Sequence, residues 1–256
     1  MIKPIGDYFP QASDGTILNP CSPDHIPITW QPGITYLASL YQRFLGDRLH
    51  SVYLRGSIVR GMPEASILDI DSFALVHDLE PRWSEPAWVN DFRRRLGQNA
   101  PLLPPAECYI ASWPQVQSGQ NASLAMVLQT QSLCILGTPV QAHLPTYRPG
   151  PDMMTQHRWL AEDNAWFRTA EQITQDQFQS YLKLLIRSAF ELVMERVGAY
   201  TPDLYLCCTN FIHFYPEQET KIWFCLESFL NPPVDWSTKR EPYLEMGEWL
   251  EVAFTE

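Results

Sequence analysis

A glycine-serine turn, followed by two aspartates at the start of an apolar run, constrains the fold of this chain most. Leu54-Arg55-Gly56-Ser57 closes a short β-rich segment, and Asp69-Ile70-Asp71 opens a segment that stays apolar to Val76. Because side chains alternate along a strand, the two carboxylates point the same way, roughly 7 Å apart at about 3.3 Å per residue. The residues after them read as buried on both sides, as in a central strand. Two like charges at the mouth of such a strand are unfavourable without a cation, so the pattern predicts a divalent metal site.

The turn before the aspartates suits a nucleotide phosphate. Gly56 permits a tight turn and a close backbone approach, and Ser57 is a good N-cap for a short helix predicted to begin at Ile58. A helix N-terminus attracts phosphate through its N–H groups and its partial positive charge, and Mg²⁺ is commonly shared between carboxylates and phosphates. Asp69 and Asp71 are therefore the predicted metal ligands. Taken alone, each fragment also fits an ordinary turn or strand end.

Together these residues resemble the signature of the nucleotidyltransferase superfamily, in which a hydrophobic residue, Gly, and Gly or Ser are followed by an Asp-hydrophobic-Asp or Glu pair. Residues 58–68 form the spacer. The run 56–61 resembles the small stand-alone members, which include the aminoglycoside nucleotidyltransferases and the minimal enzymes of toxin–antitoxin pairs. Arg55 and Ser72 depart from the pattern, because they stand where apolar residues are usual. The resemblance implies an α/β (α+β) nucleotidyltransferase-like domain with a mixed sheet, followed by a helical domain.

The composition indicates an acidic globular protein. The chain has 256 residues, of which 45% are apolar and 18% are charged, and its net charge is −11. Nucleic-acid binding depends on clustered Lys and Arg, so a nucleic-acid partner is disfavoured. The arginines at 93–95 fit either a local basic patch or a solvated helix face. The six cysteines lack the spacing of a zinc site and are predicted to be reduced. With no apolar signal core and no long apolar run, we expect a cytoplasmic protein that does not enter a membrane.

The turn-rich residues 147–151 predict a boundary between two domains. The first, residues 1–148, is the predicted catalytic domain and opens with an irregular arm. The second, residues 149–256, is predicted to be helical. In the first domain we expect helices over 35–49, 86–96 and 124–136, and strands over 51–54, 69–76 and 106–110. In the second we expect a long helix over 177–197 that Gly198 ends, and further elements over 204–214 and 222–230.

The resemblance also implies roles for residues outside the motif. Glu107 is the only acidic residue of the strand-like run 106–113. It is the implied third carboxylate, which would complete the metal site or take the proton of the acceptor hydroxyl; the alternative is a glutamate at the rim of a turn. Lys183 and Arg187 share a face of the long helix with Glu191 and Glu195. The resemblance implies that the two cations contact the triphosphate, and the alternative is an ordinary solvated face.

Two weaker candidate groups lie at the start of the second domain. The rings of Trp159, Trp166 and Phe167 fit either stacking on a base or acceptor, or core packing. Glu162 and Asp163 are further candidates for a general base.

The predicted function is a Mg²⁺-dependent nucleotidyltransferase that moves a nucleoside monophosphate from an NTP to a hydroxyl of a small acceptor and releases pyrophosphate. We expect ATP as the nucleotide and two Mg²⁺ ions, held by Asp69, Asp71 and Glu107, with the triphosphate on Gly56 and Ser57. One alternative is nucleotidylation of a protein or RNA, as in toxin–antitoxin pairs. Another is a non-enzymatic nucleotide-binding or partner-binding module with this fold. No other catalytic or phosphate-loop motif is present in the sequence.

Overall fold

The computed structural model describes residues 4–64, 67, 69–78, 89–234, 236 and 239–255, and the chain forms two compact units. An α/β unit spans Leu18–Tyr147, and a helical unit contains the chain from Arg148 onward together with the residues up to Ile17. The residues up to Ile17, the first part of the predicted arm, are therefore grouped with the helical unit, whereas residues 18–33 belong to the α/β unit. Phe9 donates its N–H to the Tyr200 carbonyl at 2.8 Å and packs against the Tyr200 ring, which ties this segment to the helical unit.

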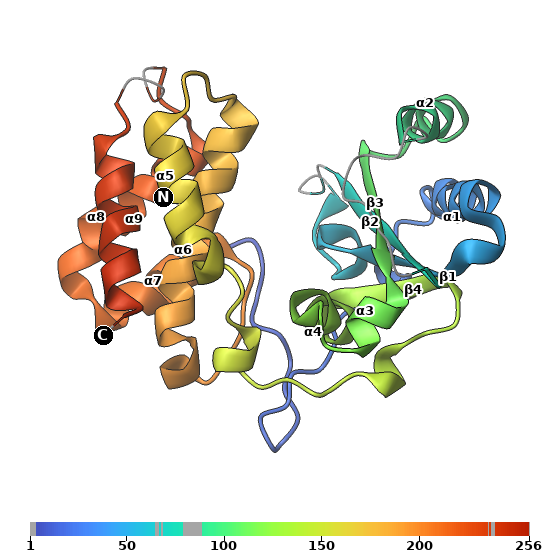
Figure 1. The fold of residues 1–256 in the computed structure, drawn as a ribbon, viewed down its shortest axis with the longest axis horizontal. Coiled ribbons are helices and arrows are strands. Elements are labelled where there is room, and N and C mark those ends of the chain that lie inside the picture. The colour runs from blue at the N-terminus through green and yellow to red at the C-terminus, as the bar shows by residue number, and fades with distance from the viewer. Residues whose placement is uncertain are drawn as a thin grey trace. The chain divides into compact units, whose positions relative to one another are not determined.

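The α/β unit is built on a mixed sheet with strand order β3-β2-β1-β4 (Figure 1). β2 pairs in antiparallel fashion with β1 and in parallel with β3, and β4 is antiparallel to β1. Beyond Asp71, every residue of β2 is buried, which confirms the predicted central strand. The strands are β1 (Leu49–Arg55), β2 (Ile70–Val76), β3 (Ala106–Ser112) and β4 (Ser132–Gly137).

Helices cover both faces of this sheet, because successive strand residues are apolar toward opposite sides. One face packs against α1 (Gln31–Leu45) and α2 (Val89–Asn99) through a core that includes Tyr41 and Phe92. The other packs against α3 (Trp113–Gln117) and α4 (Ala122–Gln131) through a core that includes Phe73.

Three predicted helix bounds in this unit differ from the structure. The first helix begins at Gln31, since Pro32 is tolerated in a first turn, and stops before Gly46, whose φ is 54°. The helix predicted over 124–136 ends at Gln131, and β4 follows. Leu133 and Ile135 face one core and Cys134 the other, which is a strand alternation that a short apolar run does not reveal. α2 runs on to Asn99, and residues 86–88 lie outside the described residues.

The helical unit is organised around α6, which contacts each of the other four helices. Thr174 and Gln177 form a capping box at its start, and Gly198 ends it with a φ of 67°, which confirms the predicted long helix. α7 and α8 lie where two elements are predicted, whereas α5 and α9 are not predicted. The helices are α5 (Leu160–Thr169), α6 (Gln175–Val197), α7 (Leu204–Phe214), α8 (Glu219–Leu230) and α9 (Glu241–Ala253).

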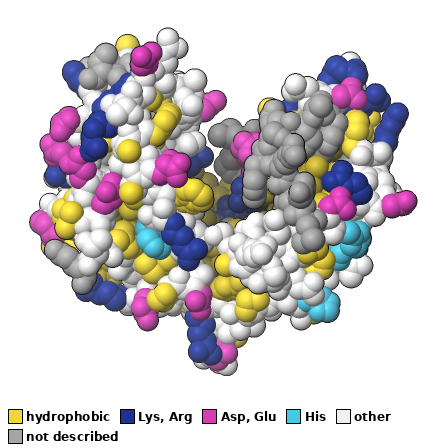
Figure 2. Space-filling view, in the orientation of Figure 1, with side chains coloured by type: hydrophobic (Ala, Val, Ile, Leu, Met, Phe, Trp, Pro, Cys, Tyr) yellow, Lys and Arg dark blue, Asp and Glu magenta, His cyan; other side chains and the backbone are white. Residues whose placement is uncertain are grey.

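Short 3-10 turns connect several of these elements. They are η1 (Pro23–His25), η2 (Gly46–Arg48), η3 (Ser57–Val59), η5 (Gln141–His143), η6 (Pro151–Met153), η7 (His157–Trp159) and η8 (Pro216–Gln218). Within the described ranges, no helix has both the length and the apolar character that crossing a bilayer requires. On the face seen in Figure 2, acidic side chains lie among the basic ones.

Candidate active site

A row of charged residues crosses three strands at one end of the sheet. Asp71 on β2 lies opposite Arg55 on β1 and beside Glu107 on β3. In the next row of the same face, three aromatic rings stack with centroid separations of 5.4 and 5.2 Å: Tyr53, Phe73 and Tyr109. The charged row therefore stands at the edge of a packed aromatic layer, with its side chains directed to one face.

Gly56 brings the backbone of the turn against Asp71. A Cβ at this position would lie 2.8 Å from Asp71 Oδ2, and the φ of 84° is in the region that favours glycine. A larger residue would displace the carboxylate. The turn and the second aspartate of the sequence motif are thus in contact.

The predicted helix at Ile58 is wrong. Only the single 3-10 turn η3 follows Gly56, and its N-cap position is occupied by Gly56, so Ser57 is not the N-cap. The turn ends because Gly61 adopts a φ of 74°. Arg60, which the sequence does not single out, donates from Nε to the Gly56 carbonyl at 3.0 Å and fixes the turn. Phosphate binding here cannot draw on the dipole of a long helix.

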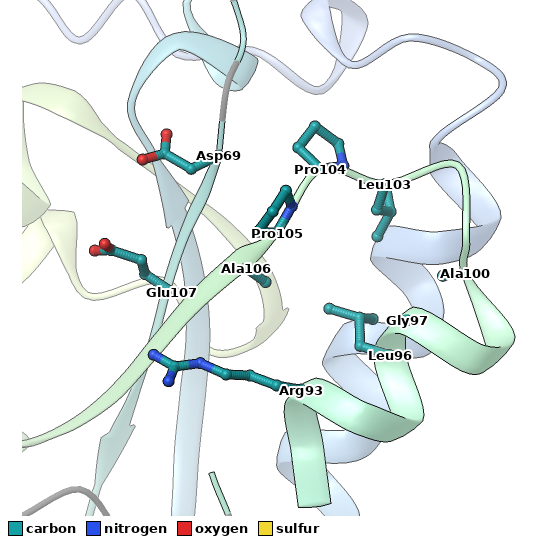
Figure 3. Close-up of a pocket in the computed structure, with 10 residues that line it drawn as sticks. All are labelled: Asp69, Arg93, Leu96, Gly97, Ala100, Leu103, Pro104, Pro105, Ala106 and Glu107. Atoms are coloured by element: carbon teal, nitrogen blue, oxygen red, sulfur yellow. The ribbon is translucent and has the colours of Figure 1, made fainter. Parts of the chain in front are cut away.

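Negative charge accumulates around Glu107. Burial raises the pKa of Glu107, and the charges of Asp71 and Asp69 raise it further, whereas the guanidinium groups of Arg55 and Arg93 oppose them. Arg55 Nη2 lies 3.6 Å from Asp71 Oδ1. Figure 3 shows the carboxylates of Asp69 and Glu107 on the same side of the strands, with Arg93 reaching toward them from α2. The structure thus brings all three predicted carboxylates into one electrostatic environment.

These carboxylates fit a magnesium site that is completed by substrate. Across the described ranges, no three His, Cys, Asp or Glu side chains are gathered closely enough to hold an ion by themselves. Mg²⁺ normally takes one or two protein carboxylates and completes its shell with water and phosphate oxygens. The charge repulsion at Glu107 and the side-chain-free turn at Gly56, which lies against Asp71, both fit a cation at this place.

Ser72 explains one departure from the family pattern. Its Oγ donates to the backbone carbonyl of Glu107 at 2.8 Å. The Tyr41 hydroxyl lies 3.0 Å from the same Oγ and is the donor of this second bond, because the single serine proton is already used. The buried pair holds β3 against β2 at Glu107, a contact between distant segments that the local sequence does not indicate.

The predicted triphosphate contacts lie on α6, in the helical unit. Lys183 Nζ lies 5.3 Å from the centroid of the Phe229 ring, and Arg187 is half-buried, with an Nε that has no hydrogen-bond partner among the described residues. Glu191, on the same face, is only 6% exposed. The face is therefore buried at Glu191 and partly solvated at Lys183 and Arg187.

The aromatic candidates of the helical unit separate into different environments. Phe167 is fully buried and stacks on Tyr181 at a centroid distance of 4.1 Å, so it is a core residue. Trp159 is 57% exposed. Trp166 lines a pocket of about 470 Å³ with Glu162 and Asp163, and burial together with the Glu162 charge raises the pKa of Asp163.

The fold is similar to that of a solved enzyme. Spectinomycin adenyltransferase AAD(9) from Enterococcus faecialis, determined with ATP and spectinomycin, aligns over 88% of this chain and 99% of its own, with a TM-score of 0.51 and 15% identity. This likeness shows the predicted fold class, an α/β nucleotidyltransferase-like domain followed by a helical part. No family model matches the chain, and no curated protein matches its sequence.

Proposed function

We propose that this protein is a nucleotidyltransferase that moves a nucleoside monophosphate from an NTP to a hydroxyl of a small-molecule acceptor. The observation that carries the proposal is the contact of the Gly56 turn with Asp71, which lies in register with Glu107 within a nucleotidyltransferase-like fold. The solved neighbour binds ATP and a small antibiotic, which supports ATP as the nucleotide and a small molecule as the acceptor.

Each residue of the site has a role in this reaction. Asp69 and Asp71 would hold Mg²⁺, which would supply charge neutralisation at the phosphates and at the entering and leaving oxygens. The backbone of Gly56 and Ser57 binds the β- and γ-phosphates. The acceptor oxygen forms a bond to the α-phosphorus, and the bond from that phosphorus to the oxygen bridging the β-phosphate breaks, so that pyrophosphate leaves with the bridging oxygen.

Glu107 takes the proton of the acceptor hydroxyl in this scheme. Glu107 is exposed and pairs in register with Asp71, so its carboxylate stands beside the proposed metal ligands, where a base can reach the acceptor hydroxyl. The second role, as a ligand of a second Mg²⁺, remains the alternative for Glu107. The contribution of Lys183 and Arg187 to triphosphate binding stays a prediction.

Label transfer tests the proposal. The protein is incubated with Mg²⁺, each α-³²P-labelled NTP and either spectinomycin or a cell extract, and the label is followed into small molecules, RNA and protein. We expect label in a small molecule, lost in Asp69→Asn and retained in Asp78→Asn, which neutralises the aspartate paired with Arg48 just after β2. Label in RNA or protein would favour the alternative acceptors. If no NTP is transferred and none raises the melting temperature, the non-enzymatic module is favoured.

A further inference from the structure

A pocket of about 470 Å³ opens beside the proposed active site, within the α/β unit (Figure 3). One end is polar and consists of Asp69, Glu107 and Arg93. The remainder is an apolar wall formed by α2 and the turn that follows it, including Leu96, Ala100 and Leu103. This volume is of the size that holds a small molecule, about 300–1,000 Å³.

The apolar wall is part of the packed core and not a loose loop. Leu96 and Ala100 are 3% and 7% exposed. Leu103 rests on the backbone of α1 at Gly33, where a Cβ would lie 2.6 Å from Leu103 Cγ and 3.1 Å from Ala100 Cβ. The wall is therefore set by the contact between α1 and α2, and the pocket is formed before any ligand arrives.

The strand order places this pocket opposite the phosphate turn. Gly56 follows β1, on one side of β2, whereas Glu107 and the pocket lie at β3, on the other side. In-line displacement needs the attacking oxygen and the leaving pyrophosphate on opposite sides of the α-phosphorus. If the triphosphate binds on the β1 side, the β3 side remains available for the acceptor.

The charges of the pocket restrict what that acceptor is. Both lining carboxylates, Asp69 and Glu107, belong to the proposed metal and base set, and the third charged lining residue is the cation Arg93. An amine-bearing acceptor would meet Arg93 and find no further carboxylate among the described lining residues. The apolar wall, in contrast, favours a ring.

We propose that this pocket binds the apolar ring of the acceptor, which is a neutral hydroxyl compound and not a polycationic aminoglycoside. The ring packs on Leu103 and on the exposed backbone of α2 at Gly97, and the hydroxyl reaches Glu107. This inference rests on the proposed function and names its acceptor class.

Gly97 provides a test by filling the pocket. It lines the pocket on α2, and a Cβ there would meet nothing within 4 Å, so Gly97→Leu adds bulk without a clash at Cβ and removes a helix-weakening glycine. Gln98→Leu is the matched control, because the neighbouring residue is exposed and outside the lining. The probes are 4-fluorobenzyl alcohol and 4-fluorophenyl β-D-glucoside, and their binding is followed by ¹⁹F NMR titration.

We expect at least one probe to bind the wild type and Gln98→Leu, to bind Gly97→Leu at least about tenfold more weakly, and to remain bound when Mg²⁺-ATP is added. Binding by none of the probes, equal binding to Gly97→Leu, or displacement by ATP overturns the proposal. The ATP-induced rise in melting temperature and transfer to spectinomycin are measured on the same variants. If Gly97→Leu still transfers label to spectinomycin as the wild type does, the proposed acceptor class is overturned, but the proposed function is not. Probe binding without any NTP binding overturns the proposed function and, with it, the acceptor role.

Discussion

One glutamate in each unit shows how differently a fold treats a carboxylate. Glu191 in the helical unit is 6% exposed and accepts the N–H groups of Thr155, Gln156 and His157 at 2.6, 2.8 and 2.9 Å. His157 Nδ1 adds a fourth contact at 3.0 Å. Glu107 in the α/β unit is more exposed, yet its neighbours include two further carboxylates, and its pKa is raised.

The difference teaches that burial alone does not mark a functional carboxylate. The oxygens of Glu191 are occupied by donors of the protein itself, so this residue anchors the chain before α5 to α6. The charge at Glu107 is increased by Asp69 and Asp71 and only partly opposed by Arg55 and Arg93. Like charges kept together in a folded protein indicate a site that a ligand completes.

The largest expected effect is on transfer in Asp71→Asn. We expect the rate to fall about a thousand-fold or more, because metal binding supplies several kcal/mol and each 1.36 kcal/mol is about a factor of ten. The free energy of unfolding without Mg²⁺ should stay unchanged or rise slightly, since repulsion with Asp69 and Glu107 is relieved. The half-exposed contact with Arg55 is worth little.

Single-turnover transfer of labelled ATP and thermal melts with and without Mg²⁺ measure both parts of this prediction. If Asp71→Asn unfolds while Mg²⁺ leaves the wild-type melting temperature unchanged, the aspartate pair is structural, and the contrast with Glu191 disappears.

Glu191→Leu should show the opposite behaviour, with loss of stability as its first consequence. Three backbone N–H groups lose their acceptor, at about 1–3 kcal/mol each, so we expect the free energy of unfolding to fall by about 3 kcal/mol or more. Urea denaturation of the full chain measures it. Glu195→Leu, one turn later and exposed, should change stability by no more than about 0.5 kcal/mol. A loss equal to that of the control would mean that Glu191 is not an anchor.

The parts of the fold that sequence predicts well are those with an unambiguous period. β2 carries an apolar run after its two carboxylates, and α6 carries an apolar stripe between a capping box and Gly198. β4 is missed because a short apolar run fits a strand or a helix equally, and only its pairing with β1 decides. The segment before Ile17 is missed for a related reason, since its contacts are with residues far along the chain.

The residues of the site can likewise be separated into those that the sequence predicts and those that it does not. Gly56, Asp69 and Asp71 are close in sequence, so their spacing alone predicts the cluster. The contacts of Ser72 and Arg93 depend on strand register and on the placement of α2, which no local pattern contains. Arg94 and Arg95 both pair with Asp91, as a solvated helix face predicts, whereas their neighbour Arg93 lines the pocket.

The smallest expected effect concerns the pH dependence set by Arg93. Burial and the two aspartates raise the pKa of Glu107, whereas the guanidinium of Arg93 lowers it. Arg93→Gln should therefore raise the pKa of Glu107 further above the ordinary value of 4.5. Because the ionised carboxylate is the base, the acidic limb of kcat/KM should move to higher pH.

The raised pKa of Glu107 also fixes the direction in which the stability of the fold changes with pH. Between 4.5 and its raised pKa, Glu107 in the native state keeps a proton that the unfolded chain has lost, so its contribution favours the fold at acid pH and is lost as pH rises through the native pKa. The pH–rate profile and a ¹³C NMR titration of the Glu107 carboxyl test this prediction, with Arg94→Gln, next to it on α2, as the unshifted control. A limb that does not move in Arg93→Gln, but moves to lower pH when Mg²⁺ is raised, would identify Glu107 as a metal ligand, because the ion then competes with the proton for the same oxygens.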